Sequence, residues 1–95
     1  MTEEPFRALH LTDPDRMSLF GSIDELSIDS LRATLAELRT PTAVDLSDVT
    51  YLPSMALNVF LRAMADGSEK ITLQVRPGTI AQRVLHVTGL PHELV

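Results

Sequence analysis

Strand and helix patterns alternate along the chain, and this alternation is the feature that most restricts its possible folds. Residues 42–46 form a short apolar run, and residues 71–76 alternate apolar with polar side chains, as a half-buried strand does. Apolar residues recur at helical spacing in residues 28–39 and fill most of residues 55–66. Because strands separated by helices pair in parallel through right-handed crossovers, the chain is predicted to form an α/β sheet with packed helices.

The N-terminal region follows a different pattern, with two strands and no helix between them. Residues 6–11 and 17–20 are predicted strands, and Asp13-Pro14-Asp15 supplies turn-forming residues between them. Two strands joined by so short a turn form an antiparallel hairpin. The predicted fold is therefore one domain over residues 1–95: a small mixed β-sheet with an N-terminal antiparallel hairpin, parallel central strands and packed helices.

Capping residues mark the predicted helix boundaries. Ser27 is expected to cap the helix over residues 28–39. Thr79, followed three residues later by Gln82, matches the capping box that opens a helix, and Gly89 is expected to end that helix. The sequence leaves open whether the four residues after Pro91 complete a final strand or have lost a longer C-terminal element.

Composition excludes several classes of function. Eight basic residues against 13 acidic ones give a net charge of -5, which repels a nucleic-acid backbone. The chain has no cysteine, so disulfides, thiolate metal sites and cysteine nucleophiles are excluded, and its three histidines lack metal-ligand spacing. The N-terminus is acidic and no apolar run is long enough to span a membrane, so we expect a cytoplasmic protein without membrane insertion, metal or cofactor.

The segment Leu52-Pro53-Ser54-Met55-Ala56 lies at the predicted turn from strand to helix. A helix N-terminus favours negative charge because its first N–H groups lack partners within the helix, so a phosphate on Ser54 would be stabilised there. Three roles for Ser54 stay open: an N-cap, a phosphorylation site, or an unmodified contact with a partner. A nucleophile elbow would need glycine at the positions of Leu52 and Ala56, so hydrolase activity through Ser54 is not expected.

The helix that begins near Ser54 carries one polar stripe. At about 100° per residue, Met55 lines up with Asn58, Arg62 and Asp66, while the rest of the helix is largely apolar. Met55 is therefore expected on the exposed face. An exposed methionine at a helix start is suited to filling an irregular apolar pocket on a partner, although scattered surface methionines are also common.

Asp45 lies near the end of the predicted strand over residues 42–46, and Asp48 follows that strand. A pair of carboxylates can bind a metal or act in acid-base chemistry. The sequence context favours a simpler interpretation, in which both are turn-forming and capping residues at the end of the strand.

Four segments together resemble a STAS domain, the family that includes the anti-sigma factor antagonists. They are Gly21-Ser22-Ile23-Asp24, Val44-Asp45-Leu46-Ser47-Asp48-Val49, the apolar helix opened by Ser54, and Val84-Leu85-His86-Val87-Thr88-Gly89-Leu90. In that family the switch motif is Asp-Ser-Ser-Gly or Asp-Ser-Thr-Gly, and a partner kinase, which is also the anti-sigma factor, phosphorylates the second hydroxyl residue. Here the motif falls on Pro53-Ser54-Met55-Ala56, where only the first serine matches and Met55 occupies the phosphoacceptor position.

The resemblance implies a non-enzymatic module that binds an anti-sigma factor or a related ATPase-fold kinase. The surface it implies includes Asp45, Ser54, Met55, Asn58 and Arg62, with Ser54 as the possible phosphorylation site. Because methionine brings neither charge nor acceptor oxygens, it resembles the unmodified, binding-competent state, and we expect binding without the usual phosphoswitch. The alternative is a cytoplasmic STAS accessory subunit that binds the ATPase of a lipid ABC transporter.

Overall fold

The mixed α/β fold predicted from the sequence is present in the computed structural model, which describes residues 5–12, 15–38, 41–65 and 71–95. The elements in chain order are β1 (Arg7–Leu11), β2 (Arg16–Ser22), a 3-10 turn (Glu25–Ser27), α1 (Ile28–Ala36), β3 (Thr42–Tyr51), α2 (Ser54–Ala65), β4 (Ile71–Val75), α3 (Ile80–Thr88) and β5 (Glu93–Leu94). None of the helices within these described residues is long and apolar enough to cross a membrane.

The five strands of the described residues belong to one sheet, in the order β1-β2-β3-β4-β5. The hairpin of β1 and β2 is antiparallel, with Arg7 opposite Phe20, whereas the other neighbouring strands are parallel. β5 pairs with β4, so the segment after Pro91 does complete a final strand. The predicted turn residues Asp13 and Pro14 lie outside the described residues.

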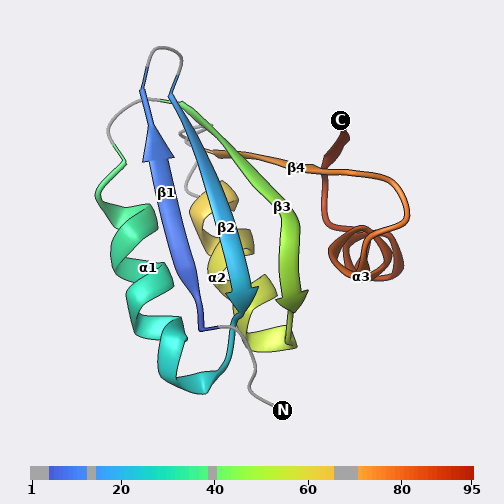
Figure 1. Ribbon diagram of the computed structural model, residues 1–95, viewed down its shortest axis with the longest axis horizontal. Coiled ribbons are helices and arrows are strands. Elements are labelled where there is room, and N and C mark those ends of the chain that lie inside the picture. The colour runs from blue at the N-terminus through green and yellow to red at the C-terminus, as the bar shows by residue number, and fades with distance from the viewer. Residues whose placement is uncertain (1–4, 13–14, 39–40, 66–70) are drawn as a thin grey trace.

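The helices divide the sheet into a covered and an uncovered face. α1 and α2 lie side by side behind β1, β2 and β3, whereas α3 lies at the side of the sheet (Figure 1) and packs against β3. In β2, Met17 and Leu19 are buried, while Ser18 and Phe20 are only half-buried and therefore face the uncovered side. The largest fully buried side chains are Met17, Leu19, Ile23, Leu31, Val44, Leu46, Phe60, Leu73, Val75 and Leu85.

β3 extends to Tyr51, beyond the predicted end of the strand at residue 46. Ser18 pairs with Asp45 but Phe20 pairs with Asp48, so β3 carries one extra residue at this point. Leu46 and Ser47 are consequently both buried, which breaks the alternation of a regular strand. The polar residues that suggested a turn are part of a bulged strand instead.

Two of the predicted caps are confirmed, and the third, Ser27, is confirmed in position but not in its hydrogen bond. The Thr79 hydroxyl accepts a hydrogen bond from the Gln82 N–H (3.2 Å), and Gly89 ends α3 with a left-handed φ of 74°. Ser27 stands at the N-cap position of α1 without a side-chain capping bond. Its hydroxyl accepts from the Asp24 N–H (2.9 Å) within the preceding 3-10 turn, which the sequence pattern did not predict.

Candidate functional site

The carbonyl of Pro53 initiates α2. It accepts hydrogen bonds from the N–H groups of Ala56 (3.0 Å) and Leu57 (3.2 Å), so Pro53 occupies the N-cap position and Ser54 is the first helical residue. The N-cap role considered for Ser54 is therefore wrong. Pro53 precedes the helix, and the Pro53 carbonyl accepts the first hydrogen bonds of α2. Ser54 is exposed on the first turn, where both a phosphorylation site and an unmodified contact remain predictions.

The polar stripe of α2 lies on the surface, as predicted. Met55 is 43% exposed, and Asn58 and Arg62 are exposed one and two turns further along the helix. The opposite side of α2 is buried and includes Ala56 and Phe60, both 0% exposed. Asp66, the fourth residue of the predicted stripe, lies outside the described residues. The first two turns of α2 thus present an apolar side chain followed by an amide and a guanidinium.

This stripe borders a groove between α1 and α2, with a volume of about 470 Å³. Buried apolar side chains form its floor, and exposed side chains, Met55 and the two arginines Arg32 and Arg62 among them, form its rim. The lining residues are Ile28, Arg32, Leu35 and Ala36 of α1, and Met55, Asn58, Val59, Arg62 and Ala63 of α2. The sequence predicted the α2 wall but missed the α1 wall, because the pattern of each helix contains no information about which helix packs beside it.

Arg32 is the charged residue that α1 contributes to the groove. Its guanidinium forms an ion pair with Asp29, one helical turn earlier, at 3.0 Å. Both side chains are well exposed, at 62% for Arg32 and 95% for Asp29, so solvent screens this pair and it contributes at most about 1 kcal/mol. Arg32 is therefore available to exchange this contact for one with a ligand.

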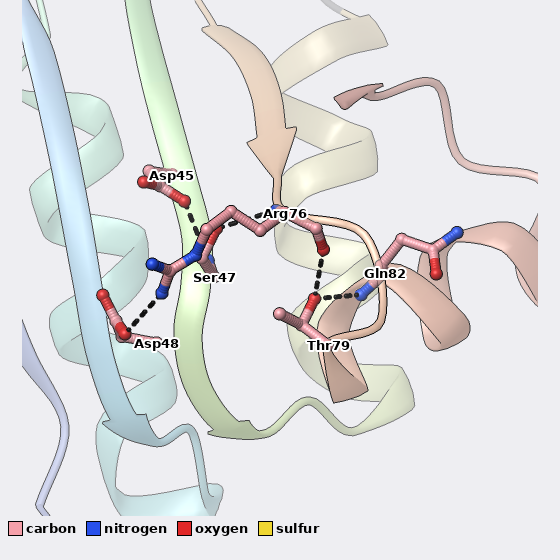
Figure 2. Close-up of polar contacts among 6 residues, drawn as sticks. All are labelled: Asp45, Ser47, Asp48, Arg76, Thr79 and Gln82. Atoms are coloured by element: carbon pink, nitrogen blue, oxygen red, sulfur yellow. Dashed lines mark hydrogen bonds and ion pairs between the residues drawn. The ribbon is translucent and has the colours of Figure 1, made fainter. Parts of the chain in front are cut away.

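Asp45 and Asp48 lie inside β3, on the uncovered face of the sheet (Figure 2). A carboxylate oxygen of Asp45 accepts a hydrogen bond from the Ser47 N–H at 2.8 Å, which stabilises the bulge. Asp48 forms an ion pair with Arg76 at 3.0 Å. The interpretation of both as carboxylates at a strand end is wrong in position, because the bulge lets β3 continue past them.

Asp45 is not brought together with the other predicted contact residues. It lies six residues before the end of β3, roughly 20 Å along the strand at about 3.3 Å per residue. It projects on the side of the sheet away from α1 and α2 (Figure 2). Ser54, Met55, Asn58 and Arg62 therefore form one continuous surface, and Asp45 belongs to another.

The surroundings of Asp45 and Asp48 form a polar network that joins β3 to the end of β4 and the start of α3. The Ser47 hydroxyl accepts a hydrogen bond from the Arg76 N–H at 2.8 Å, just beyond the point where β3 and β4 stop pairing. The Thr79 hydroxyl donates to the Arg76 carbonyl at 2.8 Å and also caps α3 (Figure 2). Within the described residues, no group of three or more histidine, aspartate or glutamate side chains is placed to hold a metal ion. These hydrogen bonds link β3, the end of β4 and the start of α3, so the network has a structural role.

Comparisons with known proteins identify the fold. No protein-family model matches the sequence, and no curated protein matches it significantly. Among solved structures, the chain is similar to the crystal structure of an anti-sigma factor antagonist from Mycobacterium paratuberculosis, with a TM-score of 0.74 and 22% sequence identity. The similarity covers 95% of this chain and 86% of that chain. The chain therefore has the fold of an anti-sigma factor antagonist, as the resemblance to STAS domains predicted.

Proposed function

We propose that this chain is a non-enzymatic interaction module of the anti-sigma factor antagonist kind, which binds an anti-sigma factor or a related ATPase-fold kinase through the first turns of α2. The fold supports the general kind of protein. The observation that carries the proposal is the exposure of Met55. This side chain is 43% exposed, lies on the rim of the groove between α1 and α2, and is in line with Asn58 and Arg62. Flexible, polarizable methionines at such positions fill irregular apolar pockets on partners.

The proposed binding is constitutive. Met55 stands where the resemblance places the phosphoacceptor, and a thioether cannot be phosphorylated. An unmodified apolar side chain leaves the surface in its binding-competent form, so control would act through the amount of the chain or through the partner. Phosphorylation of Ser54 would instead add about -1.5 to -2 charges beside Met55. Intact-mass measurement of the protein from its native host distinguishes these mechanisms.

A charge substitution at Met55 tests the proposal. Calorimetric titration of the Met55→Glu variant with each ATPase-fold anti-sigma kinase of the host should show a loss of affinity of about 30-fold or more, because a buried interface anchor contributes 2 kcal/mol or more. The matched control is Leu61→Glu, on the same helix, 48% exposed and outside the lining of the groove. Unchanged affinity of Met55→Glu, or an equal loss in both variants, contradicts the proposed surface.

The missing phosphoacceptor also favours a second candidate, an accessory subunit of a lipid ABC transporter. The two candidates use the same surface but different ATPase partners, and both partners would be met in the cytoplasm. Titration of the unmodified chain with the ATPase subunits of the host's lipid ABC transporters separates them. Binding there that is lost in Met55→Glu, with no binding to any anti-sigma kinase, would assign the chain to the transporter.

A further inference from the structure

The groove between α1 and α2 combines an apolar floor with a basic rim. Ile28, Leu35 and Val59 of the floor are 8%, 4% and 7% exposed. Among the described residues that line the groove, two are charged, and both are arginines, Arg32 and Arg62. The chain as a whole carries a net charge of -5 with only eight basic residues, so this local excess of positive charge opposes the overall composition. The groove is therefore complementary to an apolar ligand that carries negative charge.

The length of the groove matches a short stretch of helix. Its lining runs from Ile28 to Ala36 on α1 and from Met55 to Ala63 on α2. Each of these spans rises about 12 Å at 1.5 Å per residue, or a little more than two helical turns. An amphipathic helix that lies in a groove of this length presents apolar side chains at positions i, i+3, i+4 and i+7 to the floor.

From this complementarity we infer that the groove receives an acidic amphipathic helix of the partner, an inference that rests on the proposed function. The apolar face of that helix covers Ile28, Leu35 and Val59, and carboxylates at its flanks pair with Arg32 and Arg62. Arg32 gives up its exposed pair with Asp29, which is weak. An anionic membrane surface fits the groove less well, because the chain as a whole is strongly acidic.

Synthetic peptides test the charge preference directly. Peptides of equal length, with leucine at positions i, i+3, i+4 and i+7 and with glutamate, glutamine or lysine at the flanks, are titrated into the labelled protein at low salt. Two-dimensional NMR records the amide shifts. The glutamate peptide should bind about ten-fold or more tightly than the lysine peptide, because like charges across an interface are strongly disfavoured. Its shifts should concentrate on the residues that line the groove.

Charge variants then show whether the two arginines cause the preference. Arg32→Gln combined with Arg62→Gln should reduce affinity for the glutamate peptide by about two- to ten-fold and remove its advantage over the lysine peptide. Arg83→Gln, an exposed arginine of α3 outside the groove, should change neither. Asp29→Asn should raise affinity for the glutamate peptide, since it frees Arg32.

Several results overturn the inference: no peptide binding, equal or preferred binding of the lysine peptide, shifts away from the groove, or a preference that survives the double arginine substitution. These results are distinguishable from failure of the proposed function. If Met55→Glu abolishes binding of the kinase but the peptides show no preference for acid, the proposed function stands and the groove has another role. If the peptides behave as expected but no ATPase partner binds, the class of partner is wrong.

Discussion

The bulged part of β3 and the exposed stripe of α2 present polar groups in opposite ways. On β3, Asp45 and Ser47 each make a 2.8 Å hydrogen bond within the chain, and Asp48 pairs with Arg76. On α2, Met55 and Arg62 lie on the exposed side of the helix, beside a groove. Groups that are already paired hold the fold together, whereas exposed groups beside a concave apolar surface are available to a partner. On this contrast we assign a structural role to the first region and propose the second as the binding surface.

The largest expected effect comes from a cavity in the hydrophobic core, because both regions are supported by that core. Leu73 of β4 and Leu31 of α1 are both 0% exposed. Leu73→Ala or Leu31→Ala should lower the free energy of unfolding by about 2 to 4 kcal/mol, because each leaves a cavity. Urea denaturation measures this loss. Leu26→Ala, at a residue 90% exposed, is the control and should stay within about 0.5 kcal/mol of the unmodified protein.

A substitution in the β3 network should affect stability without affecting binding. Ser47→Ala removes the hydroxyl that accepts the Arg76 N–H at 2.8 Å, at a residue only 8% exposed. We expect a loss of about 1 kcal/mol, because the Arg76 N–H loses its acceptor in a partly buried hydrogen bond. Calorimetric titration with the partner, under conditions where the variant is folded, should give unchanged affinity. Weaker binding by the folded variant would show that this polar network is part of the interface. The two regions would then no longer differ in role.

Local patterns predicted the elements of this fold well because each depends on nearby residues. The alternation from Ile71 to Val75 and the Thr79 cap of α3 are both present in the structure. The extension of β3 past Leu46 was missed, because a bulge places Leu46 and Ser47 together in the interior and makes the strand look like a turn.

The candidate site was predicted only in part, for the same physical reason. The exposure of Met55 follows from the period of one helix and could be read from the sequence. Arg32 lines the groove because its side of α1 faces α2. Strands that are far apart in the sequence bring the two helices together, so the pattern of α1 alone does not predict this neighbour. The resemblance to STAS domains groups Asp45 with Met55, whereas β3 carries Asp45 to the face of the sheet away from α2.

Substitutions on the exposed stripe should show the reverse of the Ser47 result. Asn58→Ala and Arg62→Ala truncate exposed side chains, so each should change the free energy of unfolding by no more than about 0.5 kcal/mol. Each should nevertheless weaken partner binding measurably in a calorimetric titration. Thermal denaturation of the same samples supplies the stability control. Full affinity in both variants would mean that α2 does not dock the partner through this stripe.

The smallest expected effect concerns Asp24, in the turn that leads into α1. A hydrogen bond from the Ser27 hydroxyl, at 2.8 Å, is the main cause that holds the pKa of Asp24 below its ordinary value. The ionised carboxylate therefore stabilises the fold above the pKa of the unfolded chain, about 4, and this contribution is lost as the pH falls through the lower folded pKa. In the Asp24→Asn variant, the free energy of unfolding should fall less steeply below about pH 4 than in the unmodified protein. Urea denaturation at a series of pH values measures this difference.

Asp29→Asn is the matched control for this effect, because Asp29 is 95% exposed and its partner Arg32 is itself well exposed. Its stability should follow the pH dependence of the unmodified protein more closely than that of Asp24→Asn. Ser27→Ala supplies the complementary test, since it removes the hydroxyl donor and should reduce the same pH dependence while Asp24 remains. If the curves of Asp24→Asn and the unmodified protein coincide, the turn before α1 does not depend on this carboxylate. The α1 wall of the groove would then be positioned by packing of Ile28, Leu31 and Leu35 alone.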